Sequence, residues 1–484
     1  MLKACGDTMS DTSNTKTMKE QALEIFQRQK AAGRRQPFLS LKERRRNLLK
    51  LENLLLQNQD VIAQAIRRDF GHRSVHETRL LEIFPAVSGL SDARRRLRKW
   101  MKPRRRHVSL LFPGAANRVI PQPKGVVGIV SPWNYPLLLV LGPLTCALAA
   151  GNRCMVKMAA HSQGLCRLLR DLIGREIPED LIAILPDVSG SDFSALPFDH
   201  LVFTGSPASG KTVMAAAARH LTPVTLELGG KSPAIILDDF DLKKAAQRIL
   251  YFKCCNAGQT CVAPDYLFLP EDRVQTFTAA AREVVERLYA RLETDDYTGI
   301  ISEEAFSRLT ALLEDAREKG GRPVGLLPDA APDEKQRKIP PTLVLDVTED
   351  MQLMQSEIFG PILPVKTFRG LDEVMAYINA RPHPLAIYMF TNHKPSRRKL
   401  LYNTLSGGVC INDCAVHVAQ HDLPFGGVGN SGMGQYHGRE GFLEFSKLRP
   451  VFRQAPLAST AFVYPPYGRR FDRFYTLMTR LRRW

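Results

Sequence analysis

The feature that most constrains the fold is an alternation of short apolar segments with helical segments between residues 126 and 236. The apolar segments have the length and composition of buried strands. Stretches with the three- and four-residue spacing of helices separate several of them. Strands that alternate with helices pair in parallel and are covered by helices, so this region predicts an α/β domain on a parallel sheet. The predicted strands are "GVVGIVSP", "RCMVKM", "LIAILP", "HLVFTG" and "PAIILDD".

Helices are predicted before this region, and a second strand–helix series follows it. Residues 19–102 repeat apolar residues at helical spacing, as in "LSLKERRRNLLKLENLLLQNQD". From residue 265 to about residue 412, the segments "DYLFLP", "PPTLVLDV", "PILPVKTF", "LAIYMFT" and "GGVCIND" predict further strands. A Gly-rich segment over residues 424–438 closes this series, and the last 32 residues form an appendage.

The composition is that of an ordinary globular protein with free thiols. The 484 residues suffice for two or three domains, and 44% apolar with 24% charged residues is a usual balance. The N-terminal residues contain no hydrophobic signal core, and no apolar stretch approaches the roughly 20 residues that span a bilayer. Nine cysteines, an odd number without regular spacing, are typical of a reducing compartment. We therefore expect a cytoplasmic protein.

The formal net charge of +18 is concentrated in two runs, at residues 93–107 and 469–484. A basic surface can contact nucleic acid or an anionic membrane, or attract anionic cofactors. For the first run we favour a solvated helix face, because neither interleaved aromatic residues nor a nucleic-acid motif accompanies it. No nucleic-acid partner is expected.

Three residues in separate segments carry candidate chemistry. Cys261 lies in "NAGQTCVAPDY", where Gly and Pro indicate a loop and an accessible sulfur, although most cysteines of this kind are small buried thiols. Glu227 ends an apolar stretch before Gly-Gly and is either a solvated turn residue or a base with a raised pKa. Asn134 in "SPWNYP" is either a turn residue or a donor to an oxyanion. Together they form the set that nucleophilic thiol catalysis requires.

A different chemistry is indicated by "FTGSPASGKTVM" at residues 203–214, which contains the G-x-x-x-x-G-K-T pattern of P-loop NTPases. A strand is predicted over residues 200–203 and a helix over residues 211–221, and "PAIILDD" downstream ends in acids that can hold magnesium. An NTPase leaves the cysteine, glutamate and asparagine without a role. Only 27 positions separate Lys211 from Asp238. We therefore regard the pattern as coincidental.

Taken in order, six segments resemble the aldehyde dehydrogenase superfamily over about residues 41–451. The variants "CVAPDY", "LTPVTLELGGKSP" and "MGQYHGREGFLEFSK" are similar to the class that includes fatty-aldehyde and bacterial coniferyl-aldehyde dehydrogenases. The combination of the cysteine loop with Glu-Leu-Gly-Gly-Lys is highly specific. The six segments are "SPWNYPLLL", "FTGSPASGK", "TLELGGKSP", "NAGQTCVAPDY", "EIFGPILPV" and "LPFGGVGNSGMG".

The resemblance implies the catalytic roles and the fold. Cys261 attacks the aldehyde carbon, Asn134 and the N–H of Cys261 hold the oxyanion, and Glu227 activates the water that hydrolyses the thioester. The implied fold is α/β, with a parallel-sheet (Rossmann-type) cofactor domain, an α/β catalytic domain and a small β bridging segment that pairs subunits into a homodimer. The expected ranges are 1–107 and 125–229 for the NAD(P)-binding domain, 230–430 for the catalytic domain, 108–124 and 431–452 for the bridging segment, and 453–484 for a basic amphipathic tail.

The resemblance also implies an NAD or NADP cofactor and its contacts. In the family, the strand–loop–helix at residues 205–210 directs a helix N-terminus at the pyrophosphate. The chain departs from the family pattern at Ala160, where relatives carry a glutamate that binds the adenosine ribose. Losing that carboxylate removes a repulsion against a 2′-phosphate, and Lys157 and His161 can attract one, so NADP is expected to be accepted. The implied contacts are Pro132, Trp133, Lys157, Gly205, Ser206, Gly210, Glu357 and Phe359.

Cys410, Cys414, His417 and His421 look like zinc ligands, but only two residues separate the cysteine pair from the histidine pair, where a zinc finger has about twelve. No metal is therefore expected.

The tail "YPPYGRRFDRFYTLMTRLRRW" predicts a helix with apolar residues on one face and arginines around it. It either lies on an anionic membrane or covers the substrate tunnel of its own or a partner subunit. The apolar face consists of Phe471, Phe474, Met478 and Leu481, with Leu477 and Trp484 beside it.

The sequence leaves the substrate open between an aromatic aldehyde such as coniferaldehyde and a medium- or long-chain aliphatic aldehyde. A rival enzyme class would pass the thioester to coenzyme A, and Glu227 at the hydrolytic position argues against it. A basic binding protein without activity would have no use for the cysteine, glutamate and asparagine together.

Overall fold

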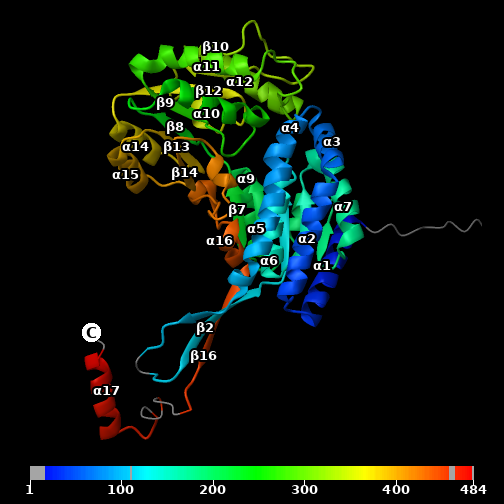
Figure 1. Cartoon of the computed structure of the whole chain (residues 1–484), viewed down its shortest axis with the longest axis vertical. Coiled ribbons are helices and arrows are strands. Elements are labelled where there is room, and N and C mark those ends of the chain that lie inside the picture. Colours follow the sequence, from blue (N-terminus) through cyan, green and yellow to red (C-terminus); the bar gives the residue numbers. More distant parts are fainter. Residues whose placement is uncertain (1–16, 110–111, 457–459, 461–463, 482–484) are drawn as a thin grey trace, which may run out of the picture.

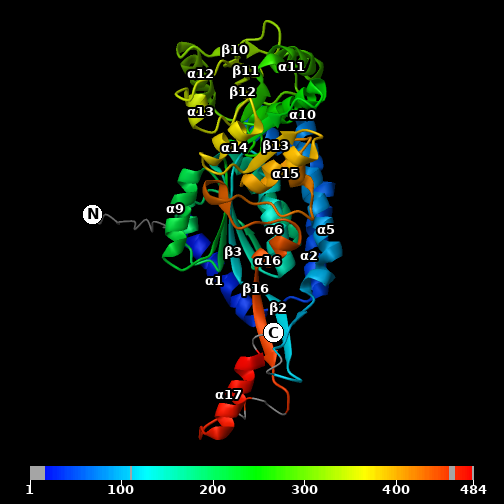
Figure 2. The same ribbon diagram turned by 90° about the vertical axis from the view of Figure 1, so that its left-hand side faces the viewer.

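The computed structural model describes residues 17–109, 112–456, 460 and 464–481. Within these residues the chain builds two α/β units and a projecting β arm (Figures 1 and 2). In the described part of the chain, every helix is too short or too polar to cross a membrane.

The first unit is a six-stranded sheet in which every neighbouring pair except β15–β7 is parallel. Its four longer inner strands are mostly buried, as the continuous apolar runs predicted. In spatial order the strands are β15 (Gly432–Met433), β7 (Val224–Leu228), β6 (His200–Gly205), β3 (Val126–Ser131), β4 (Arg153–Met158) and β5 (Ile182–Ile184).

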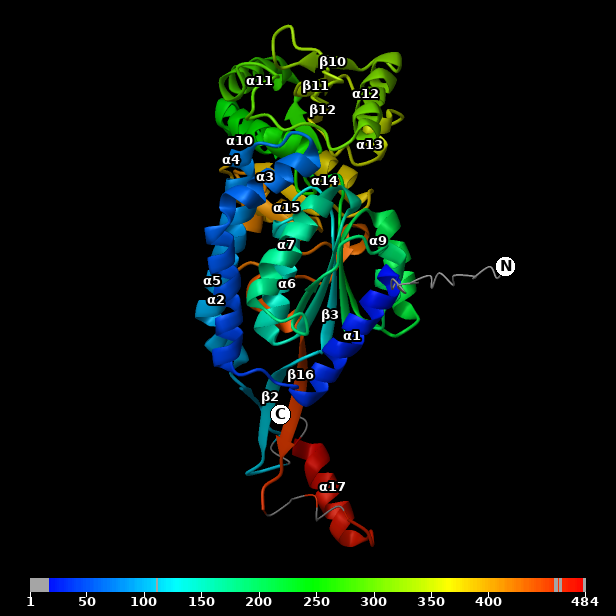
Figure 3. The same cartoon turned by 90° about the vertical axis from the view of Figure 1, so that its right-hand side faces the viewer.

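Helices cover both faces of this sheet (Figure 3). Buried side chains of α6 (Leu138–Ala150) and α7 (Gln163–Glu176) pack on one face, and those of α1 (Met18–Arg35) and α9 (Pro207–Ala218) pack on the other. α6 is apolar all round because further helices cover its outer side. These and the remaining helices of the unit are α2 (Leu41–Gln57), α3 (Gln59–Phe70), α4 (Val75–Thr78), a π-helical turn η1 (Arg79–Ile83), α5 (Phe84–Met101) and α8 (Gly190–Ser194).

The second unit is a seven-stranded sheet in which only β10 runs antiparallel to its neighbour. In spatial order its strands are β10 (Arg322–Gly325), β11 (Thr342–Leu345), β12 (Ile362–Phe368), β9 (Tyr266–Pro270), β8 (Pro233–Ile236), β13 (Ala386–Phe390) and β14 (Gly408–Ile411). One face packs against α10 (Leu242–Cys254), α11 (Val274–Leu288) and α12 (Glu303–Glu318), and the other against α14 (Leu371–Asn379) and α15 (Lys394–Asn403).

The arm is an antiparallel sheet of β1 (Arg104–Arg106), β2 (Ala116–Pro123) and β16 (Ser446–Arg453), registered from Ser446 opposite Pro123 to Arg453 opposite Ala116. It extends away from the two units, with α17 (Arg469–Leu481) beyond its end (Figures 1 and 2). The other short elements are η2 (Ala160–Ser162), η3 (Cys255–Gly258), η4 (Glu271–Arg273), α13 (Gln352–Gln355), η5 (Val416–Ala419), η6 (Gly429–Ser431) and α16 (Gly438–Glu444).

Two short strands fall in a different sheet from the one implied by the expected domain ranges. β1 lies before residue 107 but pairs with β2 in the arm, and β15 lies after residue 431 but pairs with β7 at the edge of the first sheet. Strands of two or three residues carry no periodicity, so the sequence cannot show which sheet they join.

Candidate active site

The carboxyl ends of the parallel strands of the first sheet lie along one edge. β3 pairs with β4 on one side and with β6 on the other, and β7 lies beyond β6. The chain therefore winds in opposite directions on the two sides of β3, and doubly wound folds bind ligands in the crevice at such a switch point. Pro132 and Trp133 follow β3, and Gly205 and Ser206 end and follow β6, so all four lie at this edge.

Cys261 lies in a tight turn between α10 and β9. Just before it, Asn256 and Ala257 have φ values of 51° and 50°, a left-handed conformation that is unfavourable for residues with a Cβ. The N–H of Ala263 donates to the carbonyl of Thr260 at 2.9 Å and closes the turn around Cys261. Cys261 is partly exposed, whereas the other cysteines of the described ranges are buried. The strained loop thus presents this sulfur to a ligand.

A cavity of about 570 Å³ leads to this cysteine. Its wall is predominantly apolar and comes from both units: η1, α5 and α6 on one side, and α10, the cysteine loop and the segment after β14 on the other. Such a lining suits a ligand with a large apolar body. Residues that the sequence analysis did not identify include Phe84, Leu138, Phe252, Val418, Phe425 and Tyr436.

Asn134 lies beside the cysteine loop. Its side chain is 3% exposed, and its Nδ2 donates to the carbonyl of Gln259, two residues before Cys261, at 3.1 Å. An amide nitrogen carries two hydrogens, and Gln259 is the partner recorded for Nδ2 among the described residues, so a second hydrogen is left to donate. Asn134 therefore has the position and the donor capacity to stabilise an oxyanion formed at Cys261.

Glu227 lies near the carboxyl end of β7 and is 2% exposed. Neither of its carboxylate oxygens has a hydrogen-bond partner among the described residues. Burial, together with the negative charge of Glu444, raises the pKa of Glu227 well above its ordinary value. A buried, unpaired carboxylate of raised pKa is suited to accept a proton from water near neutral pH.

The cysteine and the carboxylates lie close enough to influence one another. Burial, followed by the charges of Glu357 and Glu227, raises the pKa of Cys261 to about 12. In this arrangement the sulfur is a neutral thiol at neutral pH, so a base must take its proton as it attacks a carbonyl. The backbone N–H groups of Cys261 and Val262 lower the same pKa, and thus point at the sulfur from its own turn.

Glu357 and Phe359 come from the segment after α13 and reach the first unit. The carboxylate of Glu357 lies against Gly229, where an added Cβ would be 1.9 Å from Oε2. Burial and the charge of Asp265 raise the pKa of Glu357 to about 8. The ring of Phe359 contacts Trp133 edge-on at 5.5 Å between centroids. These two residues thus close over the crevice from the second unit.

A sequence model of the aldehyde dehydrogenase family matches residues 7–451, nearly the whole chain. The chain belongs to the aldehyde dehydrogenase family.

Individual relatives agree with this assignment. The chain is 51% identical over 460 residues to a probable coniferyl aldehyde dehydrogenase of Pseudomonas aeruginosa, covering 94% of this chain and 96% of the relative. It is 46% identical over 421 residues to the coniferyl aldehyde dehydrogenase of a Pseudomonas species, covering 86% and 87%. The solved substrate-bound state of Staphylococcus aureus AldH superposes with a TM-score of 0.88 at 34% identity, covering 94% of this chain and 99% of that one. The predicted α/β fold and the predicted enzyme class are confirmed, and the NTPase and nucleic-acid alternatives have no support.

This aldehyde dehydrogenase is an oxidoreductase, and its family uses NAD(P). The residues at the switch point fit such a cofactor. Gly229 leaves room for the Glu357 carboxylate, an acceptor suited to ribose hydroxyls, and any side chain at that position would displace it. The exposed Ser206 caps the N-terminus of α9, the kind of helix end that binds phosphate groups.

The structure corrects the expected strand–loop–helix at residues 205–210. α9 already begins at Pro207, so one residue, Ser206, joins β6 to the helix. Gly210 lies inside the helix, where its N–H donates to the carbonyl of Ser206 at 2.9 Å. An added Cβ there would be 2.8 Å from Leu228, so Gly210 allows α9 to pack closely on β7 and offers no free amide to a phosphate. The same geometry explains why this dehydrogenase carries the NTPase pattern without its open loop.

Lys157 lies at the same edge, in β4 opposite Val130 of β3. Burial lowers its pKa. Ala160 and His161 follow in η2, and both are exposed. Ala160 has no carboxylate, so it cannot neutralise the positive charge of the neighbouring Lys157.

The cysteines and histidines that resemble zinc ligands have other contacts in this enzyme. Cys410 Sγ lies 3.1 Å from His417 Nδ1. Cys414 is buried in the core, and His421 lines the cavity. No group of three or more metal-binding side chains occurs in the ranges that the structure describes.

Proposed function

We propose that this aldehyde dehydrogenase oxidises a bulky apolar aldehyde, of the coniferaldehyde type or with a medium or long aliphatic chain, to the free carboxylic acid. The observation that supports this most directly is the apolar cavity that ends at Cys261, with Asn134 and Glu227 grouped around the same loop. The two relatives named coniferyl aldehyde dehydrogenase, at 51% and 46% identity, favour the aromatic substrate.

Each residue has a defined task in this reaction. The sulfur of Cys261 bonds to the carbonyl carbon as its proton passes to one of the two carboxylates beside it, Glu357 or Glu227. A second hydrogen of the Asn134 amide and the N–H of Cys261 donate to the oxygen that becomes negative. A nicotinamide bound at the switch point would supply the hydride acceptor, and Cys261 would then hold the substrate as a thioester. Glu227 then takes a proton from the water that cleaves this thioester, and the thiol is restored. Because Glu227 is buried and unpaired beside the cysteine, hydrolysis is favoured over transfer to coenzyme A.

A panel of aldehydes tests the substrate class. We expect kcat/KM for coniferaldehyde and for long aliphatic aldehydes to exceed that for acetaldehyde by about 100-fold or more, since each buried methylene contributes about 0.8 kcal/mol. Val418→Trp places a larger side chain in the cavity wall and so narrows the cavity, which should lower kcat/KM for the large aldehydes more than for acetaldehyde. A preference for acetaldehyde would refute the proposal.

Each assay is run with NAD and with NADP, because we propose that the absence of a carboxylate at Ala160 allows NADP to bind. Strict NAD dependence would contradict this.

The arm is proposed to pair two copies of the chain into a homodimer. Its sheet projects from the body and carries the exposed side chains of Leu448 and Phe452. Large apolar side chains on a projecting sheet gain stability from a second copy.

The tail is proposed to contact an anionic membrane. Arg469, Arg473 and Arg480 on α17 are exposed, and the arm adds the exposed run Arg104–Arg106. Because α17 lies beyond the end of the arm, it does not cover the cavity of its own subunit (Figures 1 and 2). Phe471, Phe474 and Met478 are half-buried, whereas the side chain of Leu481 and residues 482–484 lie outside the described side chains.

Sedimentation with liposomes tests the tail. We expect the full chain to pellet with anionic vesicles about tenfold more than a chain ending at Pro456, because basic residues each add about 1 kcal/mol near an anionic surface. Neutral vesicles should remove the difference. Equal pelleting of the two chains would refute membrane contact and leave a partner subunit's cavity as the place for α17.

A further inference from the structure

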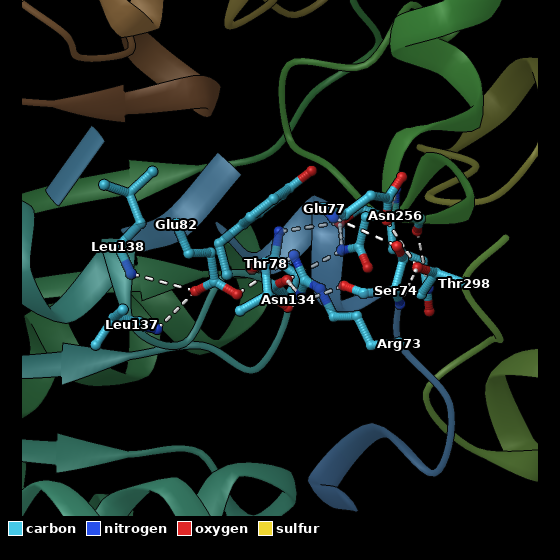
Figure 4. Close-up of polar contacts among 12 residues, drawn as sticks. Arg73, Ser74, Glu77, Thr78, Glu82, Asn134, Leu137, Leu138, Asn256 and Thr298 are labelled. Carbon is cyan, nitrogen blue, oxygen red and sulfur yellow. Dashed lines mark hydrogen bonds and ion pairs between the residues drawn. The ribbon is translucent and has the colours of Figure 1, made fainter. Parts of the chain in front are cut away.

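A buried ion pair contacts the turn that carries Asn134 (Figure 4). The side chains of Arg73 and Glu82 are both 0% exposed, and Arg73 Nη2 lies 3.3 Å from Glu82 Oε1. Removing two charges from water is costly, and a buried pair persists only where further contacts compensate for the lost hydration. The contacts of this pair therefore indicate which part of the structure it stabilises.

Both partners bind the main chain of the same turn, which links β3 to α6. Arg73 donates from Nη1 to the carbonyl of Asn134. Glu82 accepts at Oε2 from the N–H groups of Leu137, at 2.7 Å, and Leu138, at 3.2 Å. The ion pair thus binds the turn both at Asn134 and at Leu137 and Leu138 (Figure 4).

Two aromatic rings pack against the guanidinium of Arg73. Its carbon lies 4.8 Å from the ring centroid of Phe70 and 4.8 Å from that of Tyr135. The hydroxyl of Tyr135 lies 2.8 Å from Oγ1 of Thr260, the neighbour of Cys261. The planar, stacked guanidinium is a form that lysine cannot reproduce.

The same segment also holds the cysteine loop. Glu77 accepts from the N–H of Asn256 at 3.0 and 3.1 Å and from Oγ1 of Thr298 at 2.7 Å. The side chain of Asn256 in turn donates to the carbonyl of Asn134 at 3.0 Å and to that of Gln259 at 3.1 Å. The carbonyl of Asn134 is therefore fixed by two donors, one from each unit (Figure 4).

We propose that Arg73, held by Glu82, is a positioning residue for the oxyanion site: it fixes the main chain of Asn134 so that the side-chain amide faces the oxygen of the carbonyl group attacked by Cys261. This inference rests on the proposed role of Asn134. Arg73 is proposed to act through Asn134, since its hydrogen bond goes to that carbonyl while its ion pair with Glu82 and the two rings hold the guanidinium in place. Displacement of a catalytic donor by about 1 Å lowers a rate on the order of 100-fold.

A double-mutant cycle tests the proposal. Arg73→Lys keeps the charge but loses the planar guanidinium, with its paired N–H donors and its stacking on the two rings. It should lower kcat about 10- to 100-fold with little change in the KM for the cofactor. In the Asn134→Ala background the same substitution should change kcat by less than about twofold, because the donor that it positions is already absent. The matched control is Arg44→Lys, which alters another buried arginine bound to the carbonyls of Leu39 and Ala149. It should cost stability but leave kcat within about twofold.

The outcomes separate this inference from the proposed role of Asn134. An unchanged kcat for Asn134→Ala would refute the role of that amide. A large loss of kcat for Asn134→Ala, combined with equal losses of kcat for Arg73→Lys in both backgrounds, would refute the positioning role of Arg73 and leave the role of Asn134 intact. Should Arg73→Lys fail to fold, Glu82→Gln serves in the same cycle, since its amide oxygen still accepts from Leu137 and Leu138 while the charge opposite Arg73 is gone.

Discussion

Replacing Cys261 with alanine should abolish aldehyde oxidation, lowering kcat by about 10⁴-fold or more while the protein stays folded. Removal of a nucleophile has effects of this size because the residual site can only bind and polarise the substrate. Cys261 is partly exposed in its turn, so loss of the sulfur removes little packing, and we expect the melting temperature to change by no more than a few degrees.

The matched control is Cys154→Ala. Cys154 is buried in β4 near its amino end, away from the edge where the site lies, so this variant should retain its turnover. Mass spectrometry after incubation with aldehyde and cofactor gives an independent measurement. An acyl adduct should be trapped on Cys261 in the acid-quenched wild-type enzyme and on no residue of the alanine variant. Full activity of Cys261→Ala would remove the basis of the proposed mechanism.

The sequence predicted most strands because they are long enough to show a pattern. It grouped residues 233–236 with the first sheet, however, whereas β8 lies in the second, and it did not identify β7. The segments predicted around residues 126–131, 153–158, 200–205 and 233–236 are strands, since runs of β-branched and other apolar residues between helical stretches have few other uses. The start of α9 was missed. A Ser-Pro pair at Ser206 and Pro207, an N-cap followed by the first helical position, indicates a helix there, whereas the glycine-rich pattern of the same stretch is typical of an open loop.

The site was predictable only where one residue performs the chemistry. Cys261, Glu227 and Asn134 stand in recognisable segments. The pair of Arg73 and Glu82 stands in "RSVHETRLLE", which has the composition of a solvated helical face. Its burial follows from packing against the distant turn between β3 and α6, and no local pattern encodes that packing. The cavity wall was missed for the same reason, because its residues come from separate helices of both units.

Glu227→Gln should separate the two halves of the reaction. The glutamine is nearly isosteric, and Glu357, whose charge also acts on Cys261, remains to take the thiol proton. Thiol attack and hydride transfer should therefore proceed, and one equivalent of reduced cofactor should form in a rapid burst. Steady turnover should then fall about 10²- to 10⁴-fold, because no carboxylate takes the proton from the attacking water. Stopped-flow absorbance measures the burst, and mass spectrometry measures the thioester that accumulates on Cys261. Undiminished turnover would assign the base to another group, of which Glu357, with a pKa of about 8 beside the same cysteine, is the first to test.

The pH dependence of turnover tests the role of Glu227 as the base in thioester hydrolysis. A base acts in its deprotonated form, so thioester hydrolysis is present above the pKa of Glu227 and is lost as the pH falls through it. Burial raises that pKa above its ordinary value, and the charge of Glu444 raises it further, so the acidic limb lies above pH 4.5 in the wild type. Glu444→Gln keeps an acceptor for Oγ1 of Thr225, now 2.8 Å away, but removes the charge, so the limb should move to lower pH with the base intact. In Glu227→Gln the limb should vanish. A limb that stays in place in both variants would show that a group other than this carboxylate governs hydrolysis.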